Sequence, residues 1–99
     1  MKIFDWDERK NEKLKKERGI SIEEVILCIQ EGKVLAILEH PNPQRYKGQK
    51  LVIIEIENYA YVVPYEERGD TIYLKTVFPS RKYTKIYLMR RKGKDGDNG

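Results

Sequence analysis

The sequence predicts a single α+β domain, in which two helices precede a four-stranded antiparallel sheet and a short helix follows it. The chain has 99 residues, enough for one domain with its own core. Apolar residues recur with helical spacing up to residue 32 and form runs of strand length from residue 33 to residue 78. Short connections between these runs favour antiparallel strands. We expect the helices to cover one face of the sheet.

Capping signals place the first two helices. The first is expected over about residues 7–18, capped by an aspartate and stopped by Gly19. The second begins at Ser21, which forms a capping box with Glu24, and ends at Gly32. The first helix has few apolar residues, so we expect its lysines to form a solvated face.

The remaining elements follow from apolar runs and their breaks. Strands are expected at residues 34–38, 51–56, 60–65 and 71–78. Pro64 lacks a backbone N–H, so it must lie at an edge, an end or a bulge of the sheet. Ser80 is expected to cap a last helix that ends near residue 88 or 89. Residues 1–89 then form the domain, and residues 90–99 form a flexible basic and polar tail.

Composition excludes several classes of protein. A single cysteine, Cys28, excludes an intramolecular disulfide, and its apolar neighbours predict a buried thiol. No apolar run approaches ~18 residues and no signal-peptide pattern opens the chain, so we expect a cytoplasmic protein. One histidine, one cysteine and no carboxylates at ligand spacing predict neither a metal site nor a cofactor.

The distribution of charge points to an anionic partner. The net charge is +4, but residues 81–94 contain seven arginines and lysines and no acid. Such asymmetry favours a polyanion or an acidic protein as partner. Cations and a phenol beside the end of a strand also favour handling of nucleic-acid phosphate. A solvated surface remains the alternative, because basic runs are common on small domains.

Four segments carry a family resemblance. Residues 4–11 (FDWDERKN) and 19–25 (GISIEEV) resemble the opening of BrnT-type toxins, which belong to the RelE/ParE superfamily of bacterial type II toxin–antitoxin systems. Residues 68–70 (RGD) and 80–82 (SRK) resemble the family's final hairpin and the Ser-Ala-Arg-type motif after its last strand. The resemblance covers roughly residues 3–88. The chain departs from the family where Glu17-Arg18 replaces Lys-His.

This resemblance implies a RelE-like fold and a metal-independent endoribonuclease that inhibits translation. The ribose 2′-OH would attack the adjacent phosphate and leave a cyclic phosphate and a free 5′-hydroxyl. In the superfamily, an arginine near the end of the last strand and a later tyrosine often act in the site, and Arg81 and Tyr87 hold those places. The partners implied are RNA, either free or on the ribosome, and a small antitoxin encoded by the adjacent reading frame. The alternative is a non-catalytic ParE-like inhibitor, or an RNA- or protein-binding module of the same fold.

The reaction needs a base, a cation for the phosphorane charge and an acid for the leaving oxygen. One histidine excludes a two-histidine mechanism, so lysine, arginine and tyrosine must act, with Glu66 or Glu67 as further candidates. The predicted catalytic residues are Arg81, Tyr87, Lys82, Lys50 and His40. The predicted RNA-binding residues are Arg45, Lys47, Tyr65, Lys85, Arg90 and Arg91. The alternatives left open are a salt bridge for Arg81, core packing for Tyr87 and Tyr65, and ordinary surface for Lys82, Lys50 and His40.

Overall fold

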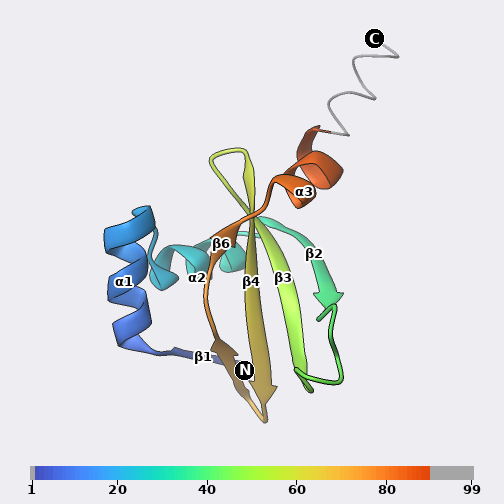
Figure 1. The fold of residues 1–99 in the computed structure, drawn as a ribbon. Coiled ribbons are helices and arrows are strands. Elements are labelled where there is room, and N and C mark those ends of the chain that lie inside the picture. Colours follow the sequence, from blue (N-terminus) through green and yellow to red (C-terminus); the bar gives the residue numbers. More distant parts are fainter. Residues whose placement is uncertain (1, 90–99) are drawn as a thin grey trace.

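The computed structural model describes residues 2–89, which form an α+β fold with a mixed six-stranded sheet (Figure 1). The elements in chain order are β1 (Ile3–Trp6), α1 (Glu8–Arg18), α2 (Ile22–Gln30), β2 (Val34–Glu39), β3 (Gln49–Ile56), β4 (Tyr59–Arg68), β5 (Thr71–Leu74), β6 (Phe78–Pro79), α3 (Arg81–Thr84) and the π-helical turn η1 (Lys85–Met89). Within residues 2–89, no helix has the length and apolar character that crossing a bilayer requires.

The sheet order is β1-β5-β4-β3-β2, and β6 pairs with a separate part of β4. The α+β class is thus confirmed, but the expected four-stranded antiparallel sheet is wrong. Residues 3–6 form an additional strand, β1, which pairs in parallel with β5. Only four residues long and half-exposed, β1 has no local signal that separates it from a helix entry. Its partner lies far along the chain, and pairing at that distance leaves no trace in local spacing.

The predicted helix ends are confirmed. The Asp7 side chain caps α1 by accepting a hydrogen bond from the Arg9 N–H, and Gly19 ends the helix at a φ of 69°. In α2, Ser21 and Glu24 form the expected capping box. These ends are predictable because each depends on residues within one turn.

Asn11 joins α1 to α2 and is fully buried. Its Oδ1 accepts a hydrogen bond from the Ile22 N–H at 2.8 Å, and its Nδ2 donates to Glu23 at 2.9 Å and to Glu8 at 3.2 Å. Glu8 also accepts from the Trp6 indole N–H at 2.9 Å. The residues of the opening motif therefore have a structural role, which is to hold the two helices together.

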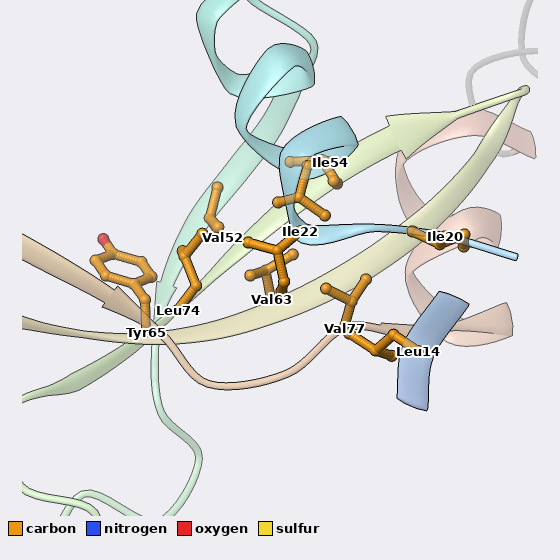
Figure 2. Close-up of a cluster of buried hydrophobic side chains, with 10 residues drawn as sticks. Leu14, Ile20, Ile22, Val52, Ile54, Val63, Tyr65, Leu74 and Val77 are labelled. Carbon is orange, nitrogen blue, oxygen red and sulfur yellow. The ribbon is translucent and has the colours of Figure 1, made fainter. Parts of the chain in front are cut away.

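Helices cover both faces of the sheet, so the expectation of one covered face is wrong (Figure 1). In β3 the four consecutive residues 51–54 are all buried. Val52 and Ile54 pack with α1 and α2 in the cluster that Figure 2 shows. Leu51 and Ile53 lie in a second cluster, against which α3–η1 packs. A continuous apolar run is typical of a strand that is buried on both faces.

Pro64 explains why the strand expected at residues 71–78 is split. Pro64 is buried in the central strand β4, and its carbonyl oxygen accepts a hydrogen bond from the Lys75 N–H at 2.9 Å. The nitrogen and carbonyl of one strand residue point to the same neighbouring strand, so the missing N–H of Pro64 faces the carbonyl of Lys75. There β5 has ended, and residues 75–77 belong to no strand until β6 begins. Pro64 thus lies opposite the gap between β5 and β6, where its missing N–H interrupts no strand pairing.

Candidate nucleic-acid interface

The first turn of α3 is hydrogen-bonded to the beginning of β4 through one residue, Ala60. The Ala60 carbonyl accepts a hydrogen bond from the Ser80 N–H at 2.9 Å, and the Ala60 N–H donates to Thr84 Oγ1 at 2.9 Å. Thr84 Oγ1 in turn donates to the Ser80 carbonyl at 2.7 Å. Thr84 is 4% exposed and Ala60 is fully buried. These bonds fix the backbone that carries Arg81.

A pair of tyrosines holds the same helix on the sheet. Ser80 caps α3 as predicted, and its side chain accepts a hydrogen bond from the Tyr83 N–H at 3.1 Å. The rings of Tyr83 and Tyr87 stack with centroids 6.0 Å apart and planes inclined by 24°. Both are half-buried and pack against the cluster around Leu51 and Ile53. The chain continues here as a π-helical turn. This conformation is rare in proteins, and where it occurs it is often found at functional sites.

Three cations occupy the exposed side of this helix: Arg81, Lys82 and Lys85. Within residues 2–89, none of them has a carboxylate within 4.0 Å, so the salt bridge considered for Arg81 does not form there. The Lys82 ammonium lies 5.3 Å from the centroid of the Tyr83 ring, a cation–π contact. The helix therefore presents fixed positive charge to solvent.

Lys50 lies in a different part of the molecule. In β3 it shares a face with Val52 and Ile54, which is the face that α1 and α2 cover, opposite to α3. It pairs with Tyr65 in β4, five residues beyond Ala60, which corresponds to about 16 Å along a strand. Its ammonium lies 3.9 Å from Glu67, a residue that Lys2 also contacts at 3.3 Å.

His40 follows Glu39, which pairs with Lys50, and so lies at the same end of the sheet, in the loop between β2 and β3. Figure 1 shows this loop at the end of the sheet away from α3. Its Nδ1 accepts a hydrogen bond from the Asn42 N–H at 3.1 Å, and its ring lies 4.3 Å from that of Tyr46. The Arg45 guanidinium is 5.5 Å from the Tyr46 ring, and Lys47 is exposed. These contacts form a local cluster within the loop.

Tyr65 is 7% exposed and belongs to the core cluster shown in Figure 2. Burial raises the pKa of its phenol, and the carboxylates of Glu67 and Glu39 raise it further. Its ring therefore packs in the core on the face of the sheet that α1 and α2 cover, and its hydroxyl stays protonated at neutral pH.

The predicted site residues thus separate into two groups. Arg81, Lys82, Lys85 and Tyr87 come together on one helix, whereas Lys50, His40, Arg45, Lys47 and Tyr65 lie at the other end of the sheet. Arg90 and Arg91, with the rest of the tail, lie outside the described residues. Within residues 2–89, no three His, Cys, Asp or Glu side chains are grouped closely enough to hold a metal ion.

Cys28 is only half-buried, not buried as predicted: it packs at the margin of the core cluster, and its thiol donates to the Glu55 carbonyl of β3 at 3.7 Å. Burial still raises the pKa of its thiol. Sequence reasoning also missed Thr84. Its signal is the four-residue spacing from Ser80, at which a threonine hydroxyl reaches the carbonyl one turn earlier.

No protein-family model, curated protein or solved structure matches this chain.

Proposed function

We propose that this protein is the toxin of a type II toxin–antitoxin pair, a RelE/ParE-like endoribonuclease that acts in the cytoplasm without a metal ion and inhibits translation. One observation carries the proposal. Arg81, Lys82 and Lys85 are exposed without a carboxylate partner in residues 2–89, on a helix whose start is fastened to the sheet. The resemblance of residues 4–11, 19–25 and 80–82 to the toxin family supports it.

In the proposed reaction, Arg81 stabilises the charge that gathers on the phosphorane. The ribose 2′-oxygen bonds to phosphorus, the bond to the 5′-oxygen breaks, and the products are a cyclic phosphate and a 5′-hydroxyl. The 2′-OH loses a proton to a base, and the 5′-oxygen gains one from an acid. Lys82 and Lys85 hold neighbouring phosphates, and the Tyr87 hydroxyl, two residues after Lys85, handles a proton.

The proposed antitoxin fits the same helix. Ile86 and Met89 are 38% and 56% exposed, although both are large apolar side chains. They follow the cations of α3–η1 along the same short segment, so the surface is apolar and basic together. An amphipathic, acidic partner would cover both kinds of side chain at once.

A non-catalytic inhibitor or binding module of the same fold is the second candidate. It is favoured by the separation of the predicted catalytic residues, since Lys50 and His40 lie far from Arg81. Without them, Tyr87 and Lys82 are the predicted catalytic residues that remain to exchange protons there.

Incubation of the purified protein with total RNA in EDTA tests the proposal. We expect cleavage into fragments with 2′,3′-cyclic phosphate and 5′-hydroxyl ends, and arrest of growth on induction that the adjacent reading frame relieves. Intact RNA together with arrested growth would favour the non-catalytic inhibitor. Intact RNA together with normal growth would refute both candidates as toxins.

A further inference from the structure

A cleft of about 480 Å³ lies between α1 and the chain that joins β5 to β6. The residues that line it are Lys10, Lys13, Leu14, Glu17, Arg18, Thr76, Val77 and Phe78. It is separate from the exposed side of α3, although Phe78 precedes Arg81 by only three residues.

The cleft exists because α1 rests on this chain through a single apolar side chain. Leu14 is 7% exposed and packs with Val77, as Figure 2 shows. Lys10 and Arg18 lie one turn before and after Leu14, on the same side of the helix. On the other side of the cleft, residues 76 and 77 belong to no strand, because the break opposite Pro64 releases them from the sheet.

The charge of the cleft is uncompensated. Three cations and one carboxylate line it, and none of the four forms a salt bridge within residues 2–89. Elsewhere on the same helix, Lys15 pairs with Glu12 at 3.5 Å. Lys10 and Lys13 are exposed, as expected for the lysines of α1, and they also border this concave site.

An aromatic ring completes the site. Phe78 is 39% exposed, although it is one of the two phenylalanines of the chain and stands in a strand. Proteins that bind single-stranded nucleic acids combine an exposed aromatic ring with nearby cations. The base stacks on the ring and the phosphate contacts the cations.

We propose that this cleft binds one nucleotide of a single-stranded RNA, with the base on Phe78 and the phosphate among Lys10, Lys13 and Arg18. The choice of RNA rests on the proposed function. The Cα atoms of Phe78 and Arg81 lie at most ~10 Å apart along an extended chain, a distance that consecutive nucleotides span. The cleft therefore holds a nucleotide beside the one whose phosphate meets Arg81, and extends the RNA site to the α1 side of the sheet.

Binding of a short single-stranded RNA of mixed sequence, measured by fluorescence anisotropy at several salt concentrations, tests this subsite. Arg81→Ala serves as the background, so that the strand is not cut during the measurement. Lys13→Glu should weaken binding about tenfold and lower the salt slope by roughly 0.7 for each phosphate that the protein no longer neutralises. Lys16→Glu is the matched control, because it changes the same charge on the same helix at an exposed position outside the cleft.

Phe78→Leu separates stacking from charge. It should weaken binding of the RNA roughly 5- to 100-fold, and leave binding of an abasic strand of equal length unchanged. Equal RNA affinities of Lys13→Glu and Lys16→Glu would overturn the subsite. Cleft variants that bind RNA as the parent does but no longer bind the antitoxin would also overturn it, because the cleft would then belong to the protein partner.

Different results would refute the proposed subsite and the proposed endoribonuclease function. Cleavage of RNA by the parent protein, with unchanged binding in the cleft variants, would refute the subsite and leave the proposed function standing. Weakened binding in those variants, with no cleavage by the parent, would refute the endoribonuclease and leave the subsite standing.

Discussion

Ala60 and Thr84 share a buried hydrogen bond, in which the Ala60 N–H donates to the Thr84 hydroxyl at 2.9 Å. This bond joins the last helix to the beginning of the central strand. On the edge of β4 that faces β6, the strand pairing covers only Tyr61 and Val62. Ala60 lies just before them, so the Thr84 hydroxyl takes the place of a partner strand there. Together with the bond from the Ser80 N–H to the Ala60 carbonyl, it sets the position of the cations on α3.

Thr84→Val should destabilise the protein by about 1–3 kcal/mol, because it leaves the buried Ala60 N–H without an acceptor while the side chain keeps its shape. Urea denaturation measures the loss. Thr84→Ser keeps the hydroxyl and is the control. If the valine variant unfolds at the same urea concentration as the parent, the bond does not hold the helix.

Asn11→Ala should cost about 1–3 kcal/mol of stability, because the buried Ile22 N–H loses its acceptor. Lys16→Ala, on the same helix and exposed, should stay within about 0.5 kcal/mol of the parent. Thermal or urea unfolding compares the two. Equal stabilities would show that the motif asparagine has no structural role.

Glu23 makes part of the stability depend on pH. A hydrogen bond from Asn11 holds the pKa of Glu23 below its ordinary value of 4.5. A carboxyl whose pKa is lowered by folding contributes stability above its unfolded pKa and loses it as the pH falls through the folded pKa. Relative to the parent, Glu23→Gln should therefore lose less stability on acidification below about pH 4.5, since the amide oxygen still accepts the bond. Parallel curves of stability against pH would contradict this assignment.

Tyr87→Phe should leave the free energy of unfolding nearly unchanged, because the ring that stacks on Tyr83 remains. If the hydroxyl moves a proton in the reaction, cleavage should fall by about 10²–10⁴. Tyr83→Phe is the matched control, since it removes a hydroxyl from the other ring of the same stack. Equal rates in the two variants would leave Tyr87 with packing alone.

Local signals predicted much of this fold. Helix caps at Asp7, Ser21 and Ser80 follow from side chains within one turn. What the sequence did not reveal depends on contacts between distant segments. The pairing of β1 with β5, the break opposite Pro64 and the placement of α3 on the second face are of this kind.

The candidate site divides in the same way. Arg81, Lys82 and Lys85 are neighbours in sequence, so their shared exposure could be predicted. Lys50 was expected to join them, but the face it takes depends on the register of β3 and β4. The cleft beside α1 requires Leu14 and Val77 to meet from opposite ends of the chain, and no local pattern reports that contact.

The rate at which Arg81→Ala cleaves RNA tests the central claim most directly. Removal of one preorganised electrostatic donor typically lowers the rate by ~10²–10³, while an exposed substitution changes stability by no more than about 0.5 kcal/mol. We therefore expect the variant to remain folded, to cleave RNA at least about 100-fold more slowly than the parent, and to permit growth; Lys16→Ala should cleave RNA and arrest growth as the parent does. An Arg81→Ala protein that cleaves RNA and arrests growth as the parent does would show that the active site lies elsewhere.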